Sequence, residues 1–181
     1  STLIRTLAGL QPALSGESVI QGVKVEFRNP KSIAKILSVV LTDKVDVGNL
    51  TVYDLAAMGR YPYTKWFGRA LDIDESRILN ALEKVHLKDF ANKLITELSD
   101  GELQRAMIAK ALVQDTPVIL LDEPTAHLDL PNRMETMQLL RKLAKETGKA
   151  ILLSSHDLEL ALQTADLLWL VTKEGPIKVG L

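Results

Sequence analysis

Short apolar runs and one alternating segment define the predicted strands of this 181-residue chain. Apolar runs of this length are typical of strands that are buried on both faces of a parallel sheet. The runs that predict such strands are residues 37–41, 118–121 and 150–153. Residues 17–27 alternate apolar and polar positions around Gly22, which predicts an antiparallel hairpin with one face in water. A further strand is predicted at 167–171, and a weak last one follows Gly175.

Helical periodicity fills most of the chain between these strands. Residues 1–10 form a predicted amphipathic helix that Gly9 closes at its carboxyl end. A later helix is predicted to start at Pro131, a favoured first helical residue, and to run to about Glu146 before Gly148. Helices therefore alternate with the apolar strands, which is the pattern of an α/β protein.

The segment 50–98 has a helical pattern of its own. Sequences resembling capping boxes at 51–54 and 72–75 each precede a run with helical apolar spacing. The second run carries one apolar stripe, formed by Ile78, Leu79, Leu82 and Val85. We therefore expect a small helical subdomain beside the sheet.

Length, composition and charge narrow the class of protein. A chain of 20.0 kDa with 46% apolar residues can form one domain with a sizeable core. A net charge of −1 gives no basic excess that would indicate nucleic acid as the main partner. No apolar run approaches the roughly 18 residues of a membrane-spanning helix. The absence of cysteine excludes disulfides and thiolate metal sites.

Two adjacent carboxylates, Asp122 and Glu123, follow the apolar run at 118–121. The carboxyl edge of a parallel sheet is where α/β proteins bind their ligands. One carboxylate can hold Mg²⁺, directly or through water, while its neighbour polarises an attacking water. A strand that ends in a solvated acidic turn is the structural alternative, which is less common for the sequence Asp-Glu-Pro-Thr.

A helix predicted from Ser99 to about Val113 begins shortly before this strand. Its free N–H groups and the positive end of its dipole would form an anion-binding site at Ser99 and Gly101. The same residues have a second explanation, because Ser99 and Glu102 have the spacing of a capping box.

Three motifs surround the acidic strand in a fixed order. They are Leu98-Ser-Asp-Gly-Glu-Leu-Gln-Arg105, Ala126-His-Leu-Asp129 and Ser154-Ser-His-Asp157. With these motifs, residues 1 to about 172 resemble the nucleotide-binding subunit of an ABC transporter, in which they match the signature, the D-loop and the switch histidine. The strand at 118–121 with its two acids matches the Walker B strand.

The resemblance implies a P-loop NTPase-type fold for residues 1–181. Its parallel sheet core, with an antiparallel β edge, would comprise residues 1–49 and 99–181. The inserted helical subdomain, residues 50–98, would lead into the signature motif. ATP and Mg²⁺ are the implied cofactors, and the first strands and the phosphate loop would be missing.

The resemblance also implies a role for each candidate site residue. Glu123 would be the general base, and His156 would reach the γ-phosphate. His127 would position the D-loop backbone. The expected metal-binding residues are Ser1, Asp122 and Thr42. The expected nucleotide-binding residues are Ser1, Thr2, Ser99, Gly101, Glu102 and Asp129. The expected partner is a second subunit in a head-to-tail homodimer, and some of these residues would act on the ATP that it holds.

Three features depart from the family pattern. Asp100 replaces a glycine of the signature and would repel a triphosphate if it pointed at one, yet we expect ATP binding to survive. Thr42 stands where the family has a glutamine and is two atoms shorter, which leaves Asp43 as an alternative ligand. The glycines and lysine of the phosphate loop would precede Ser1. We therefore read the chain as a fragment that lacks an N-terminal portion, and we expect these 181 residues alone to bind Mg-ATP poorly and to be inactive.

An aromatic run points to a partner. Residues 59–63, with Trp66 and Phe67 close behind, are similar to a stretch in subunits that drive import of iron–siderophore, haem or cobalamin-type chelates. The alternative is a packed corner of the helical subdomain. Aromatic residues and arginine favour interfaces, which suits docking on an integral-membrane permease.

These features together predict an ATP-hydrolysing subunit that powers an ABC importer, of the class that takes up iron–siderophore or related metal chelates. It would bind a permease at the cytoplasmic face of the membrane, and no nucleic-acid partner is expected. The alternatives are a soluble ABC-type ATPase that is not engaged in transport and a non-hydrolysing fragment.

Overall fold

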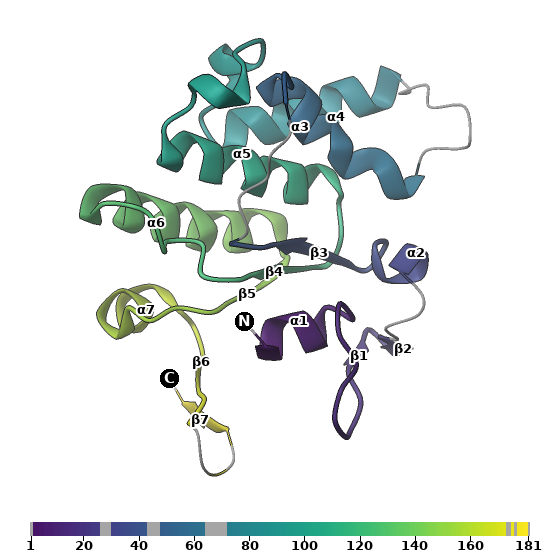
Figure 1. The fold of residues 1–181 in the computed structure, drawn as a ribbon, viewed down its shortest axis with the longest axis vertical. Helices are drawn as coiled ribbons and strands as arrows, with labels where there is room; N and C mark the ends of the chain where they lie inside the picture. Colours follow the sequence, from purple (N-terminus) through teal and green to yellow (C-terminus); the bar gives the residue numbers. More distant parts are fainter. Residues whose placement is uncertain are drawn as a thin grey trace.

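The computed structural model describes residues 2–25, 30–42, 48–63, 72–172, 175 and 177–180, and Figure 1 shows their arrangement. The α-helices are α1 (Thr2–Leu7), α2 (Pro30–Ile33), α3 (Val52–Ala57), α4 (Asp72–Lys84), α5 (Asp100–Val113), α6 (Leu130–Thr147) and α7 (Leu158–Thr164). The strands are β1 (Val19–Ile20), β2 (Val23–Lys24), β3 (Leu37–Val40), β4 (Val118–Leu121), β5 (Ala150–Leu153), β6 (Leu168–Leu170) and β7 (Lys178–Gly180). Short 3₁₀ helices span Met58–Tyr63, Lys88–Phe90 and Ile95–Glu97.

The three apolar runs form one parallel sheet in the order β3-β4-β5, as the sequence predicts. The register pairs Val40 with Leu121 and Leu121 with Leu153. All three strands therefore end at the same edge, where the two acids follow β4. Ser38, the polar residue in the first run, is buried. Its hydroxyl lies 2.9 Å from that of Thr116, which is its hydrogen-bond partner in the core.

Alternate residues of the sheet face two different helical layers. Leu37 and Leu120 pack with Ile4 of α1, whereas Ile119 and Leu121 belong to the larger core that contains residues of α3, α4, α5 and α6. This period of two is the expected result of a strand covered on both faces. Helices α1 and α2 thus cover one face, and α5 and α6 cover the other (Figure 1).

The helical segment 50–98 closes on itself at its two ends. The N–H of Val52 donates to Lys93 O, and the N–H of Ile95 donates to Leu50 O, each at 3.0 Å. Thr51 forms the predicted capping box with Asp54. Helices α3 and α4 then pack on α5 through a shared core that includes Leu55 and Leu82. The side chains of 72–74, on which the second predicted capping box depends, lie outside the described residues.

Turn and cap residues adopt the conformations that their types favour. The N–H of Leu10 donates to Arg5 O at 2.9 Å and the N–H of Gly9, at φ 68°, donates to Thr6 O at 3.0 Å, which is the hydrogen-bond pattern of a Schellman cap. The hairpin of β1 and β2 turns through Gln21 and Gly22, both at positive φ, as in a type I′ turn.

The antiparallel strands complete the mixed α/β architecture. Strands β1 and β2 form one two-stranded sheet, and β6 and β7 form another, so in the described chain they are separate from the parallel sheet. The mixed α/β fold class predicted from the sequence is confirmed. Among the described helices, none combines the length and apolar character needed to cross a bilayer.

Candidate functional site at the carboxyl edge of the parallel sheet

The two acids after β4 occupy different environments. Asp122 is only 2% exposed, and its N–H donates to Val40 O at 2.8 Å, which extends the β3–β4 ladder by one residue. Glu123 has φ 49°, a left-handed conformation that residues with a Cβ atom rarely adopt. The chain therefore changes direction between the two acids, so that Asp122 stays in the sheet edge and Glu123 leaves it.

Glu123 contacts His156, which follows β5. His156 Nε2 lies 2.7 Å from Glu123 Oε1, so the ring nitrogen and the carboxylate are in close polar contact. The histidine side chain is 86% exposed, and the glutamate side chain is 26% exposed. Both residues line a cavity of about 180 Å³, together with Arg133. The structure thus brings together the two residues that the sequence assigns to catalysis.

Three hydroxyl or carboxyl groups with a preference for hard cations meet at Asp122. Thr42 Oγ1 donates to the backbone oxygen of Asp122 at 2.6 Å, and Ser154 Oγ donates to Asp122 Oδ1 at 2.9 Å. Mg²⁺ binds through one or two carboxylates and completes its shell with water and phosphate oxygens. A buried carboxylate with one hydroxyl oxygen 2.9 Å away fits this requirement, and Asp122 is the residue that would hold the ion.

Some predicted ligands lie elsewhere or outside the described chain. Ser1 and the alternative ligand Asp43 are not among the described residues. Thr2 is the first residue of α1, and its carbonyl accepts the hydroxyl proton of Thr6 at 2.9 Å.

The N-terminus of α5 has the capping box that the sequence offers as a structural alternative. The N–H of Ser99 donates to Glu102 Oε2 at 2.8 Å, and the N–H of Glu102 donates to Ser99 Oγ at 3.3 Å. Hydrogen bonds from the Ser99 backbone and hydroxyl lower the pKa of Glu102. Capping therefore accounts for both residue types, while a phosphate contact of Ser99 or Glu102 stays a prediction. Asp100 is exposed.

Gly101 and Asp129 belong to one contact between α5 and α6. A Cβ atom at Gly101 would lie 2.7 Å from Asn132 Oδ1, so a larger residue there would have to displace the Asn132 side chain. Asp129 is the N-cap of α6 and accepts the Asn132 backbone N–H at 3.2 Å and its side-chain amide at 2.6 Å. Arg133 Nε donates to Leu128 O at 2.7 Å, which holds the preceding loop. His127 in that loop is exposed.

The aromatic run divides into an anchored part and an exposed part. Gly59 is buried, and a Cβ atom there would lie 2.3 Å from Lys110 O. The Arg60 guanidinium stacks 4.2 Å above the Tyr63 ring and also donates to Val113 O. Tyr61 is 73% exposed. The interpretation as a packed corner thus fits Gly59 and Arg60, and the interpretation as an interface fits the exposed Tyr61. Trp66 and Phe67 lie outside the described residues.

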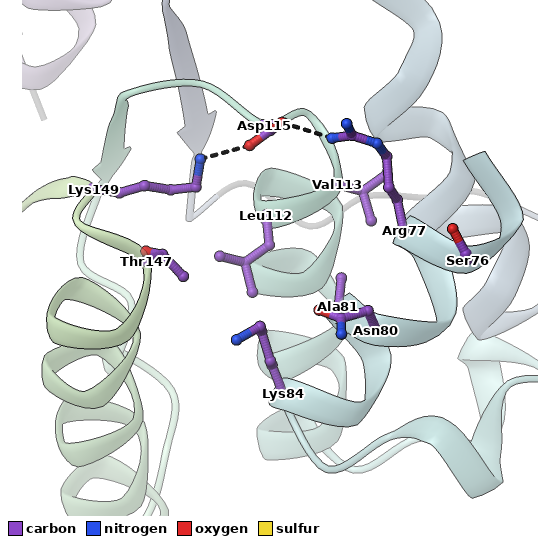
Figure 2. A pocket seen from close by; sticks show the side chains of 10 residues that line it. All are labelled: Ser76, Arg77, Asn80, Ala81, Lys84, Leu112, Val113, Asp115, Thr147 and Lys149. Atoms are coloured by element: carbon purple, nitrogen blue, oxygen red, sulfur yellow. Dashed lines mark hydrogen bonds and ion pairs between the residues drawn. The ribbon is translucent and has the colours of Figure 1, made fainter. Parts of the chain in front are cut away.

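A second, larger cavity lies at the opposite edge of the sheet. It has a volume of about 450 Å³ and is lined by residues of α4, by the end of α5 with Asp115, by Thr147 at the end of α6 and by Lys149 before β5 (Figure 2). Asp115 bridges Arg77 at 2.7 Å and Lys149 at 2.8 Å, and Lys84 lies 3.7 Å from Glu146. These cations are already paired, and the amino edge of a parallel sheet is not the usual place for a ligand. We therefore assign this cavity a structural role, in which ion pairs join α4 to the sheet.

The comparison with known proteins agrees with the motifs. The family profile described as ABC transporter matches residues 1–126. The chain belongs to the ABC transporter family. It is 42% identical over 180 residues to an uncharacterised ABC transporter ATP-binding protein of Methanocaldococcus jannaschii. The matched region covers 99% of this chain and 62% of that protein.

Other relatives have named transport roles. The chain is 36% identical over 180 residues to the iron(3+)-hydroxamate import ATP-binding protein of Bacillus subtilis, with 99% of this chain and 67% of that protein covered. It is 33% identical over 177 residues to the ferric enterobactin transport ATP-binding protein of Escherichia coli, with 98% and 65% covered. The chain thus spans about two thirds of the length of these curated relatives.

Solved ABC structures have the same fold. The structure of cbiO1 from Clostridium perfringens, part of the ABC transporter complex cbiONQ, superposes with a TM-score of 0.80 at 26% identity and covers 93% of this chain and 66% of that one. A dimeric bacterial ABC transporter cassette superposes with a TM-score of 0.73 at 27% identity and covers 92% and 73%.

Two residues of the site were missed by sequence reasoning. Ser154 contacts Asp122, and Asn132 contacts Gly101. The register would have identified Ser154, because it is the first residue after β5 just as Asp122 is the first after β4. No sequence signal identifies Asn132, since its contact depends on how α5 and α6 pack in this ABC fold.

Proposed function

We propose that this chain supplies the ATP-hydrolysing site of an ABC importer subunit. The observation that carries the proposal is the contact of Glu123 with His156 beside the buried Asp122, at the edge where parallel sheets bind ligands. Family membership gives this arrangement its substrate, ATP. The second interpretation, a solvated acidic turn, does not account for a buried Asp122.

The residues divide the work of hydrolysis between them. Glu123, at the rim of the cavity, accepts the proton of the attacking water or orients that water. His156 is exposed beside Glu123 and is available to the γ-phosphate of an incoming nucleotide. Asp122 would hold Mg²⁺, which when bound neutralises charge on the phosphates. We retain as proposed nucleotide or metal contacts Ser1, Thr2, Thr42, Ser99, Gly101, Glu102 and Asp129.

We further propose that a second copy completes the site. Gly101 approaches Asn132 at the start of α6 in its own subunit, and Ser99 caps its own helix. Their role toward phosphate would then be exerted on ATP held by the partner in a head-to-tail dimer. The dimeric arrangement of the bacterial cassette, at 27% identity, supports this assembly.

The proposed division of the chain follows from its contacts. Residues 50–98 would be the helical subdomain, and residues 1–49 with 99–181 would be the RecA-like core. Hydrogen bonds between the two ends of the 50–98 segment support this division. The exposed Tyr61, anchored through Arg60 on α5, would dock on an integral-membrane permease from the cytoplasmic side.

The proposed cargo is an iron–siderophore or related metal chelate. It rests on relatives named for iron(3+)-hydroxamate import and ferric enterobactin transport, at 36% and 33% identity. Capture of a membrane permease, as opposed to RNA or DNA, would distinguish transport from a soluble ABC function.

The test of the hydrolytic site is Glu123→Gln in a version joined to a phosphate-binding loop, such as that of the Bacillus subtilis relative. We expect turnover to fall by about 10²–10⁴-fold while ATP stays bound and the dimer accumulates. ATPase rates and light scattering would measure both effects. Glu159→Gln, which removes the same charge at an exposed position of α7, is the control. Undiminished turnover in Glu123→Gln would exclude Glu123 as the general base.

A further inference from the structure

Ser154, the first residue after β5, contacts both acids at the end of β4. Its hydroxyl donates to Asp122 Oδ1 at 2.9 Å, and the same oxygen accepts the backbone N–H of Glu123 at 2.9 Å. We infer that Ser154 is a positioning residue that orients both carboxylates of the site. This inference rests on the proposed function only for what the two carboxylates do to ATP.

The sheet register explains why Ser154 can reach both acids. Because Leu121 pairs with Leu153, the residues that follow them, Asp122 and Ser154, lie side by side. The N–H of Ser154 donates to Leu121 O at 3.0 Å, so the ladder extends to this residue. The hydroxyl is therefore held by strand backbone, which positions a side chain more rigidly than a loop does.

The hydrogen bond to Glu123 holds an unusual backbone conformation. Glu123 has φ 49°, and a residue in this region keeps its conformation only where the surrounding structure holds it. Ser154 Oγ accepts the Glu123 N–H and so contributes to holding the turn that follows Asp122. That turn places the Glu123 carboxylate 2.7 Å from His156. The hydroxyl thus acts on the general base through its backbone.

The two contacts require both functions of a hydroxyl group. A hydroxyl has one proton to donate and lone pairs to accept with. Asp122 uses the proton, and the Glu123 N–H uses a lone pair. Threonine has the same capacity, cysteine has it only weakly, and alanine lacks it. The inference therefore predicts a graded series of substitutions at this position.

Amide hydrogen exchange measured by NMR on the 181-residue chain tests the positioning role without nucleotide. In Ser154→Ala the Glu123 amide should exchange about tenfold faster, in Ser154→Cys it should exchange faster by a smaller factor, and Ser154→Thr should keep the rate of the unaltered chain. The Asp122 amide is the internal control, because it donates to Val40 O and not to Ser154. Ser155→Ala is the matched variant, because Ser155 Oγ accepts the Asp157 N–H at 3.0 Å, so it should accelerate Asp157 instead.

A kinetic measurement in the version joined to a phosphate-binding loop tests the consequence for the site. Ser154→Ala should lower kcat about 10- to 100-fold and raise the Mg²⁺ concentration needed for half-maximal rate, and Ser154→Thr should restore both. At saturating Mg²⁺, KM for ATP should change less than kcat, because Glu123 acts on the attacking water and not on ATP binding.

The outcomes separate this inference from the proposed function. Unchanged Glu123 exchange in Ser154→Ala, or no rescue of exchange by Ser154→Thr, would overturn the positioning role. Absence of ATPase activity in the unaltered extended protein would overturn the proposed function, and the exchange result would still decide the role of Ser154.

Discussion

Gly101 at the start of α5 lies directly against the side chain of Asn132 at the start of α6. A Cβ atom at residue 101 would be 2.7 Å from Asn132 Oδ1, and Asn132 in turn donates to the helix cap Asp129 at 2.6 Å. This contact joins the segment at 98–105 to the segment at 126–129 within one subunit. A larger residue at position 101 must therefore displace the Asn132 side chain, independently of any phosphate contact.

Gly101→Ala should destabilise the chain by about 1–3 kcal/mol, because the added methyl group forces the Asn132 side chain to move. Urea unfolding of the 181-residue chain would measure the loss. In Asn132→Ala the obstructing amide is gone, so the same glycine substitution should cost less in that background. Equal costs in both backgrounds would show that Asn132 is not the obstacle.

Gly59→Ala should cost more than Gly101→Ala, because the obstacle is the backbone oxygen of Lys110, 2.3 Å from the added Cβ atom, which no side-chain rotation can relieve. We expect a loss above about 2 kcal/mol in urea unfolding. Gly180→Ala, where no atom lies within 4 Å, is the matched control and should stay within about 0.5 kcal/mol. A Gly59→Ala protein as stable as that control would contradict the close packing on α5.

His156→Ala should remove most ATP hydrolysis, about 10²-fold or more, and spare nucleotide binding and stability. The reason is that the ring is 86% exposed and contacts Glu123, so its loss leaves no cavity in the core. ATPase rates, nucleotide titration and urea unfolding in the version with a phosphate-binding loop would separate these effects. His86→Asn, at another exposed position whose φ of 58° asparagine tolerates, is the control. Loss of binding instead of turnover would indicate a structural role for His156.

Asp115→Asn should destabilise the chain at pH 7 by about 1 kcal/mol or less, since its side chain is half exposed and its ion pairs are partly screened. Asparagine tolerates the φ of 55° at this position, so the backbone is not the cause. The hydrogen bond from Lys149, followed by that from Arg77, lowers the pKa of Asp115 in the folded state.

A lowered folded-state pKa places the effect in a defined pH range. The stabilisation by Asp115 is present above its unfolded pKa of about 3.9 and is lost as the pH falls through the lower folded-state pKa. The stability difference between the unaltered chain and Asp115→Asn should therefore shrink below about pH 4. A difference that stays constant from pH 7 to pH 3 would refute the ion-pair explanation. Asp89→Asn, at an exposed position, controls for net charge.

Tyr61→Ala should weaken binding to the permease by about 30-fold without changing ATP hydrolysis by the isolated subunit, because exposed aromatic residues dominate interface energies. Co-purification with the integral-membrane partner would measure it. Phe90→Ala, an exposed aromatic of the same helical segment, is the control. Equal loss in both variants would mean that the effect is not specific to the 59–63 corner.

The sequence by itself determined which segments become strands, which helices have caps and which residues can carry the chemistry. Apolar runs predict β3, β4 and β5 because a strand that is buried on both faces needs apolar residues at successive positions. The capping boxes at Thr51 and Ser99 are predictable because each joins residues only three positions apart. The signature, acidic strand and switch histidine were likewise recognisable from local order.

Only the tertiary structure decided which of these residues meet. The contacts of Ser154 with Asp122, of His156 with Glu123 and of Asn132 with Gly101 join residues about thirty positions apart. The first two depend on the β4–β5 register, and a shift of one residue would turn the side chains to the other face of the sheet. The third depends on the packing of α5 on α6. Such contacts leave no periodic signal in the sequence, because register and helix packing arise only when the whole core forms.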